Sequence, residues 1–422
     1  MKKGWIKTQL SDVATIQSGA GFPDRYQGQS DHEIPFYKVS DMNIAGNERE
    51  MIYENNTITE EVRRALGAYL FPKGSIIFPK IGGAIATNKK RLTSRDCCVD
   101  NNVMGVIPKP GRIESSFLYY FFLDHDLSEF ANEAHLPSIK KTVVEGWPIS
   151  VPASLLEQRR IDGILDEAFE GITTAKANAE RNLQNARALL ASHLQSVFTQ
   201  RGPGWVEELV GSICDVKHGL AFDGAEFSSD IPEGNPLVIT PGNFTEDGKL
   251  LFNEKNTKRF SGKPPAGFLF DVGDLVVVMT DLSSKMKILG KPAFVETDDV
   301  LHNQRIGRVV FLNDHIEKRF LYYFMMTEGF LKTIKESAIG TMVKHTAPKR
   351  ILSNVIPYPR DRKEQRSIIT RLDSLRDETQ HLESIYQRKL AVLEALKKSL
   401  LHQAFAGELC EPTEQLLQEA AL

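Results

Sequence analysis

The chain of 422 residues has few of the features that mark metal-binding, secreted or membrane proteins. Its four cysteines form neither a CxxC pair nor an alternating Cys/His pattern, so a zinc site and a disulfide framework are not expected. No apolar run approaches the roughly 18 residues that a membrane span requires, and no apolar signal segment follows the basic start at residues 1–5. We therefore expect a soluble, cytoplasmic protein that binds no metal and contacts no membrane.

Catalytic motifs are also missing. The sequence contains neither a GxxxxGK[ST] phosphate loop nor an HExxH zinc motif. Residues 263–266 read Lys-Pro-Pro-Ala and lack the Asn or Asp and the aromatic residue of a DNA amino-methyltransferase loop. These absences predict a chain without catalytic residues. An enzyme with unrecognised motifs is the alternative, and methyl transfer or DNA cleavage by the purified chain would establish it.

What the sequence does contain is a long internal repeat. Residues 4–22 match residues 204–222 without a gap, and both segments begin with Gly-Trp. The string Phe-Leu-Tyr-Tyr-Phe then occurs at 117–121 and again at 320–324. A third motif, Pro-x4-Glu-Gln-Arg, follows in each half, beginning at Pro152 and at Pro359. Because the order is the same in both halves, the chain is built twice.

Each repeat begins with about 150 residues that read as a globular α+β module, and the 41% hydrophobic content supplies its core. Aromatic residues at helical spacing predict one helix at 114–131 and its counterpart at 316–336. Short apolar runs between Gly, Pro and Asn predict strands. The predicted strands are 34–39, 75–78, 103–107, 237–240, 274–279 and 307–311.

Each repeat ends in a long helix. Apolar residues step by threes and fours in both, which is the seam of a coiled coil. Capping boxes at 154–157 and 361–364 predict where the helices begin. About 45 residues span roughly 68 Å, and the simplest packing is an antiparallel pair with one module near each end; two unrelated bundles are the alternative. The expected boundaries are a first module at 1–153, a first helix at 154–200, a second module at 201–359, a second helix at 360–407 and a tail at 408–422.

Positive charge is concentrated in two runs, although the net charge of −3 argues against a uniformly basic nucleic-acid binder. Residues 71–112 carry eight basic and two acidic side chains, and residues 255–291 carry seven and three. Each run surrounds a loop of small polar residues, 82–88 or 280–284. This combination is typical of DNA contact, with Lys and Arg on phosphates and small polar groups near base edges. A solvated surface is the alternative.

Candidate contacts follow from these runs and from the matching turns. Lys and Arg would hold phosphates, while Asn could pair with adenine and Lys with guanine. An ordinary turn residue is the alternative for each. The predicted DNA contacts are Lys38, Asp41, Asn43, Lys80, Thr87, Asn88, Lys89, Lys90, Arg91, Lys140, Lys217, His218, Asn243, Thr280, Ser283, Ser284, Lys285, Lys287 and Lys344.

The ends of the two long helices carry a wider apolar band than a two-stranded seam buries. We expect this band to contact partner proteins. Its residues are Leu190, Leu194, Phe198, Leu396, Leu400 and Phe405.

The twofold series of a Gly-Trp start, Phe-Leu-Tyr-Tyr-Phe and Pro-x4-Glu-Gln-Arg resembles the specificity subunits of type I restriction-modification systems. The resemblance covers nearly the whole chain, and residues 301–307 and 403–409 also look like that family. Residues 198–202 copy the closing segment only loosely, so the junction into the second module is expected to differ in shape. The resemblance implies an α+β fold with two tandem target-recognition domains separated by two long antiparallel coiled-coil helices, arranged as a pseudo-twofold repeat.

The same resemblance implies the partners. A specificity subunit binds double-stranded DNA with two modification subunits, which carry S-adenosylmethionine and methylate adenine. Restriction subunits with a motor-nuclease activity add ATP and magnesium. Each recognition domain would read one half of a split target, and two such different modules imply an asymmetric target. A subunit of a methylation-only system is the nearest alternative, and a coiled-coil scaffold without a DNA role is a more distant one.

Overall fold

The computed structural model describes residues 4–223 and 226–409, so Cys410 and most of the expected tail lie outside the described residues. The chain divides into two compact units. The first consists of Met1–Glu180 and Gln387–Leu422, and the second of Arg181–Tyr386. Among the described residues, no helix is both long enough and apolar enough to cross a membrane.

The first globular domain is built on two small sheets and a ribbon that joins its ends. The antiparallel ribbon pairs β1 (Trp5–Gln9) with β10 (Pro148–Pro152). The larger sheet has the order β2 (Ala14–Ser18), β9 (Val103–Pro108), β6 (Ile76–Pro79), β7 (Arg91–Thr93) and β4 (Glu50–Met51), and the smaller one has β5 (Thr57–Ile58), β3 (Ile34–Tyr37) and β8 (Cys98–Val99). Its α-helices are α1 (Leu10–Val13), α2 (Glu60–Ala65), α3 (Ser115–Asp124) and α4 (Lys141–Glu145).

The second domain repeats this plan. A ribbon of β11 (Trp205–Leu209) and β22 (Val355–Pro359) again joins the ends. One sheet has the order β12 (Cys214–His218), β20 (Ile306–Phe311), β16 (Leu275–Val278) and β18 (Pro292–Phe294). A second sheet has the order β13 (Phe227–Ser228), β15 (Arg259–Phe260), β14 (Leu237–Val238) and β19 (Val300–Leu301). A third sheet pairs β17 (Thr280–Asp281) with β21 (Lys344–His345). Its α-helices are α6 (Val210–Ile213), α7 (Lys318–Met326), α8 (Glu328–Glu336) and α9 (Pro348–Leu352).

The two aromatic helices are shorter than expected. Instead of running to residue 131, α3 ends before His125, and a 3-10 turn, η4 (Leu127–Phe130), follows it. Instead of one helix to residue 336, α7 ends before Thr327 and α8 begins after it. The breaks occur because Asp126 and Thr327 cap the following turns, their side chains accepting from Ser128 N and Phe330 N.

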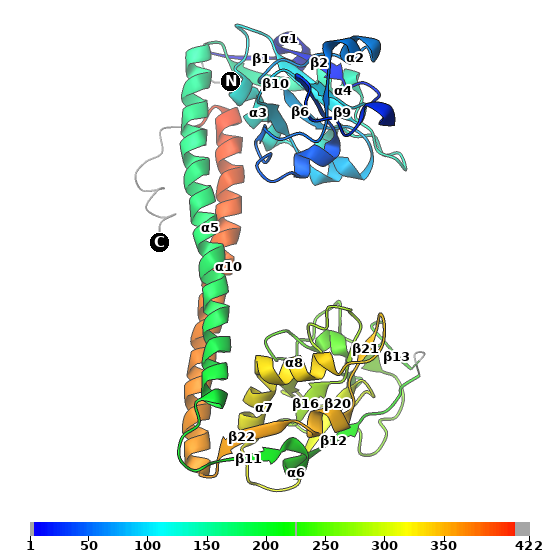
Figure 1. Cartoon of the computed structure of the whole chain (residues 1–422), viewed down its shortest axis with the longest axis vertical. Coiled ribbons are helices and arrows are strands. Elements are labelled where there is room, and N and C mark those ends of the chain that lie inside the picture. The colour runs from blue at the N-terminus through cyan, green and yellow to red at the C-terminus, as the bar shows by residue number, and fades with distance from the viewer. Residues whose placement is uncertain (1–3, 224–225, 410–422) are drawn as a thin grey trace. The chain divides into compact units, whose positions relative to one another are not determined.

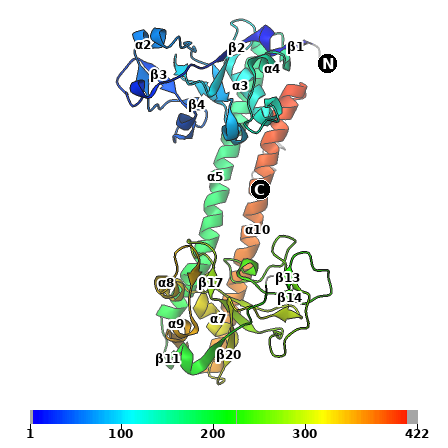
Figure 2. The ribbon, with the colours of Figure 1, turned by 90° about the vertical axis from the view of Figure 1, so that its right-hand side faces the viewer.

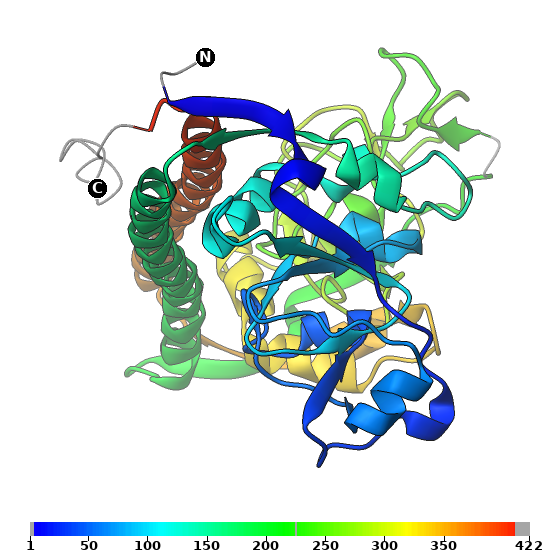
Figure 3. The ribbon, with the colours of Figure 1, turned by 90° about the horizontal axis from the view of Figure 1, so that it is seen from above.

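Each domain lies against parts of both long helices, α5 (Leu155–Thr199) and α10 (Arg362–Ala406). In the first unit, Lys176 pairs with Glu394 at 2.5 Å and Lys397 lies 5.0 Å from the ring centroid of Phe169. The helices are therefore antiparallel within that unit, as Figure 1 also shows. In the first domain, α2 and β3 lie on the side away from the helices (Figures 2 and 3).

A buried glutamine fastens each long helix to its domain. Gln158 Nε2 donates to Pro152 O at 2.9 Å, and its Oε1 accepts from Glu114 N at 2.8 Å, just before α3. Gln365 makes the matching bonds to Pro359 O and from Glu317 N, both at 2.8 Å. Both side chains are fully buried. The repeated Glu-Gln motif is thus explained by a hydrogen-bonded junction that sets where the helix leaves the domain.

The caps of the long helices differ in detail from the expected boxes. Asp361 Oδ1 accepts from Lys363 N at 2.8 Å, two residues on rather than three. Glu364 accepts from the indole N–H of Trp205 at 3.1 Å, and Glu157 accepts from Arg160 at 2.9 Å. The helices still begin directly after Ser154 and Asp361, as the sequence predicts.

Candidate DNA interface

Three lysines of the first domain surround a cavity of about 390 Å³. Lys80 follows the end of β6, and Lys140 and Lys141 stand at the start of α4. Lys80 Nζ donates to Ser18 Oγ at 3.0 Å, and partial burial lowers the pKa of Lys80. Ammonium and hydroxyl groups that face one space are suited to phosphate oxygens. The remaining lining residues carry no charge and are Ile81, Met104, Ser138, Ile139 and Thr142.

Backbone hydrogen bonds hold residues 80–82, at the end of β6, beside residues 137–139, in the loop before α4. Gly82 N donates to Pro137 O at 2.7 Å, and Ile139 N donates to Lys80 O at 2.9 Å. An antiparallel bridge joins Ile81 to Ser138. The loop before α4 therefore lies beside the end of β6. Side chains from both segments surround the cavity and form what we call the rim of the domain.

The second domain forms the same rim with different side chains. Here Thr280 pairs with His345 and Asp281 with Lys344. Asp281 is buried, and it accepts from Ser283 N at 2.8 Å and from Ile288 N at 3.0 Å. It thereby holds the turn on which Ser283, Ser284 and Lys285 are exposed.

Alignment of the strands and helices shows how the two rims differ. Met279 stands where the first domain has Lys80, and Ala347 stands where it has Lys140, since both precede matching short helices. His218, which is exposed at the end of β12, replaces Ser18. The first rim is thus lined by Lys80, Lys140 and Lys141, whereas the second carries His218, exposed serines and two lysines at other positions, Lys285 and Lys344.

Several predicted contacts have structural roles instead. Asp41 is fully buried and accepts from Lys38 N at 2.6 Å and from Asn55 Nδ2 at 2.7 Å. Asn243 is also fully buried and accepts from Thr240 N at 2.8 Å. They occupy matching turns, and each side chain satisfies backbone groups of its own turn, so neither offers its polar atoms to DNA.

Residues of the run 88–91 also make hydrogen bonds within the domain. Lys90 is buried, and its Nζ donates to Asn88 Oδ1 at 2.6 Å and to His125 O at 2.7 Å; burial lowers its pKa to about 8. Asn88 adopts a left-handed conformation and also accepts from Leu127 N. Arg91 donates to the carbonyls of Lys90 and Met42. All three side chains hold the loop, but only Lys90 is buried; Asn88 and Arg91 are half-buried, and DNA contact by them stays a prediction.

Other predicted contacts remain accessible. Thr87, Lys140, Lys217 and His218 are exposed, and Lys89 donates to the exposed Asn43. Lys38 Nζ donates to Gln27 Oε1 at 2.8 Å.

In the second domain, Lys287 pairs with Glu246 at 2.7 Å, and Lys344 donates to Gly340 O at 2.7 Å. Thr280 is buried, and its Oγ1 lies 3.0 Å from His345 Nδ1, so its hydroxyl belongs to the rim's own hydrogen bonds.

Three residues of these rims escaped prediction. Ser18 lines the lysine cavity, and its position opposite His218 in the gapless repeat was the signal that could have revealed it. Leu136 is 63% exposed beside the first rim and Met342 is 79% exposed near the second. An isolated apolar residue in a loop has no sequence signal that separates it from a core residue.

Part of the predicted partner band at the helix ends packs within the chain. Leu194 and Phe198 are buried against the second domain, and the Phe198 ring lies 5.2 Å from that of Phe320. Phe405 makes the matching contact in the first unit, 5.1 Å from Phe117. Leu194 and Phe198 are therefore unavailable to partners. The partly buried residues of the band are Leu190, Leu396, Leu400 and Phe405.

Comparisons with known proteins agree with this architecture. A family profile described as Type I restriction modification DNA specificity domain matches residues 2–182 and 204–392. The type I restriction enzyme EcoBI specificity subunit of Escherichia coli is 23% identical over 226 residues, and the MjaVIII specificity subunit of Methanocaldococcus jannaschii is 24% identical over 290 residues. These matches cover 54% and 65% of this chain and 42% and 65% of the relatives, so the chain spans less than two thirds of either relative.

Solved structures share the fold. A chain from a structure described as the structural basis underlying complex assembly and conformational transition of the type I R-M system has a TM-score of 0.75 at 17% identity and covers 97% of this chain and 99% of its own. The HsdS subunit from Thermoanaerobacter tengcongensis has a TM-score of 0.57 at 18% identity, over 97% and 98% of the two chains. Because the family profile matches most of both repeats, the chain belongs to the type I restriction-modification DNA specificity family.

Proposed function

We propose that this chain is the non-catalytic subunit that reads an asymmetric, split DNA target, one half with each domain. The observation that carries this proposal is the pair of matching rims. The domains share a scaffold, but Lys80 and Lys140 of the first correspond to Met279 and Ala347 of the second. Since base readout depends on the side chains that a scaffold presents, two rims with different side chains favour two different half-sites.

The helices supply a separation between the half-sites. Each has 45 residues, or about 68 Å at 1.5 Å per residue. Half-sites one turn apart, about 34 Å, would lie on one face of the duplex. A pseudo-twofold arrangement of the repeats, in which each domain is held by the start of one long helix and the end of the other, would keep that separation constant.

The partners are part of the same proposal. The chain would place two modification subunits, which carry S-adenosylmethionine and methylate adenine, and restriction subunits that use ATP and magnesium. It would do so in the cytoplasm, where the target DNA is. Partly buried apolar residues on the helices, such as Leu190 and Leu396, are the remaining candidates for these contacts.

The test is a genome-wide map of adenine methylation in the source strain with and without the gene. Loss of one asymmetric split motif on deletion is expected and would identify both half-sites. If no motif changed while the modification subunit was demonstrably expressed, the proposed function would be wrong and a scaffold role would be tested instead.

A further inference from the structure

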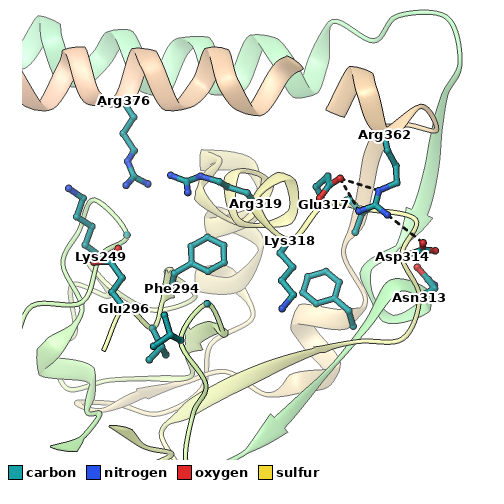
Figure 4. A pocket seen from close by; sticks show the side chains of 16 residues that line it. Lys249, Phe294, Glu296, Asn313, Asp314, Glu317, Lys318, Arg319, Arg362 and Arg376 are labelled. Atoms are coloured by element: carbon teal, nitrogen blue, oxygen red, sulfur yellow. Dashed lines mark hydrogen bonds and ion pairs between the residues drawn. The ribbon is translucent and has the colours of Figure 1, made fainter. Parts of the chain in front are cut away.

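The second unit contains a cavity of about 670 Å³ between α10 and the loops of its domain (Figure 4). Its volume lies within the range of small-molecule sites in proteins, about 300–1,000 Å³. Five basic and three acidic side chains line it. Two of the acids, Asp314 and Glu317, pair with Arg362 at 3.4 and 2.8 Å. The third, Glu296, lies beside Lys249 in Figure 4, so that the basic lining residues Lys249, Arg319 and Arg376 outnumber the acidic one at that end.

Three cations face one another at that end. Arg376 extends from α10 toward Arg319 of α7 and Lys249 of the loop before β15, as Figure 4 shows. Arg319 pairs with Asp373 at 2.8 Å. Lys249 Nζ donates to a neutral acceptor, Gln380 Oε1, at 2.7 Å.

Arg376 has unused hydrogen-bonding capacity. One terminal nitrogen donates to Tyr322 OH at 3.0 Å, but its Nε is buried and has no hydrogen-bond partner among the described residues. A buried guanidinium N–H without an acceptor is costly. Because Nε itself is shielded, an anion in this space would accept from the terminal N–H groups of Arg376 and would also reduce the repulsion among the three cations.

The rest of the cavity offers aromatic and apolar surface. Phe294 and Phe311 line it, and Lys318 lies 6.0 Å from the Phe311 ring centroid. The Phe294 ring in turn packs 5.3 Å from that of Tyr322. A ligand with an anionic end and a flat, partly apolar end would match both parts.

The corresponding place in the first unit is occupied by the chain's own side chains. In the aligned helices Phe169 stands at the position of Arg376, and its ring packs 5.4 Å from Tyr120. Arg49 pairs with Asp166 at 2.7 Å and lies over Tyr120, with its guanidinium 5.6 Å from the ring centroid. The cationic cavity is therefore a property of the second unit and not a consequence of the shared fold.

We propose that this cavity binds a small phosphate-bearing ligand of nucleotide size. Its phosphates would lie among Arg376, Arg319 and Lys249, since the planar guanidinium group suits phosphate oxygens. Its base would lie against Phe294 and Phe311. This site is separate from the rims proposed to read DNA, and it goes beyond the proposed function.

The proposal is tested by calorimetric titration of the full-length chain with pyrophosphate and with ATP. Saturable binding of one ATP per chain is expected, tighter than that of pyrophosphate because of the aromatic surface. Arg376→Met should weaken ATP binding by about tenfold or more. The matched control is Arg371→Met, an exposed arginine on the same helix outside the cavity, which should bind as the unmodified chain does.

Two results would overturn the proposal. One is the lack of saturable binding of either probe into the millimolar range, or binding that Arg376→Met leaves unchanged. The other is displacement of ATP by duplex DNA together with a weaker salt dependence of DNA binding in Arg376→Met, which would assign the cations to the DNA backbone. If Arg376→Met fails to fold, Lys249→Met, on an outer loop, serves as the second variant. The methylation map does not depend on this cavity, so the two proposals fail independently.

Discussion

Buried polar side chains explain why several predicted DNA contacts are internal. Asp41, Asn243 and Lys90 stand in polar loops, as DNA-contacting residues often do. In the structure they bond to backbone groups or neighbouring side chains and are inaccessible to solvent. Residue type could be read from the sequence, but exposure depends on which segments pack above each loop, and those segments are remote in the chain.

We predict that Lys90→Met lowers stability without changing how DNA binding responds to salt. The substitution removes the donor to Asn88 Oδ1 and His125 O; Asn88 Oδ1 keeps its bond from Leu127 N, whereas the carbonyl of His125 loses this donor, and an acceptor left without a partner costs roughly 1–3 kcal/mol. Thermal unfolding and DNA titrations at several salt concentrations measure both effects. Lys89→Met is the control, which should unfold as the unmodified chain does. A flattened salt dependence with unchanged unfolding would contradict the structural role.

Lys140 and Lys141 should behave in the opposite way. Because they line the rim cavity and make few internal contacts, changing both to Ala should weaken DNA binding across sequences and reduce the salt slope by roughly one to two units. Unfolding temperature should be nearly unchanged. An unaltered salt slope in the double variant would remove this cavity from the proposed interface.

Asp162 on α5 should make stability depend on pH. It is 7% exposed, its Oδ1 lacks a partner among the described residues, and α10 has Ile369 at the matching position. Burial, then Asp166 and Glu114, raise its pKa to about 8. The folded protein therefore holds this proton more tightly than the unfolded chain, so the stabilisation is complete below about pH 4 and is lost as the pH rises toward 8.

Asp162→Asn tests this dependence, because the amide stays neutral at every pH. We expect a gain in stability on the order of 1–3 kcal/mol at pH 8 and a smaller one at pH 5. Unfolding by denaturant at the two pH values measures it. Equal gains at both would show that the Asp162 carboxyl does not titrate differently on folding.

Among the elements, the junctions between the domains and the long helices are those that the sequence locates best. Glu-Gln-Arg was recognised as a repeated boundary, but only the structure assigned its purpose to the buried glutamine. The aromatic runs show the converse. Their spacing predicted two long helices, whereas Asp126 and Thr327 begin new turns inside them, and Asp126-x-x-Glu129 was a capping box that helical periodicity concealed.

We predict that Gln158→Met and Gln365→Met each destabilise their own unit. Each substitution removes three hydrogen bonds at a buried junction and leaves backbone groups unpaired, which should cost roughly 2–4 kcal/mol. Denaturant unfolding of the full chain measures the loss. The control is Gln184→Met, an exposed position on α5, and a comparable loss there would show that the junction is not responsible.

At the scale of the whole molecule, the proposed split target depends on the length of the helices. Removing one heptad from both α5 and α10 shortens each by about 10 Å, which corresponds to about three base pairs. We expect the unread spacer to shorten accordingly while both half-sites keep their bases. Methylation mapping of a strain with the shortened chain gives the result.

The control for that experiment replaces the same heptads with others of equal length and the same apolar pattern. This variant should methylate the original motif. If the shortened chain also kept the original spacer, the helices would not set the distance between half-sites.

The repeat, the long helices and the family follow from order along the chain, and all three could be predicted. Periodic apolar positions and duplicated motifs are local or sequential properties, so no three-dimensional information was needed to find them. Which polar residues are accessible could not be predicted in this way. Lys90 and Lys140 each belong to a Lys-Lys pair in the sequence. The packing of segments remote in the chain makes Lys90 a buried hydrogen-bond donor and leaves Lys140 exposed at a cavity. The cationic cavity at Arg376 arises for the same reason, because its basic side chains come from α7, α10 and a loop, are spread over more than a hundred residues of sequence and meet only on folding.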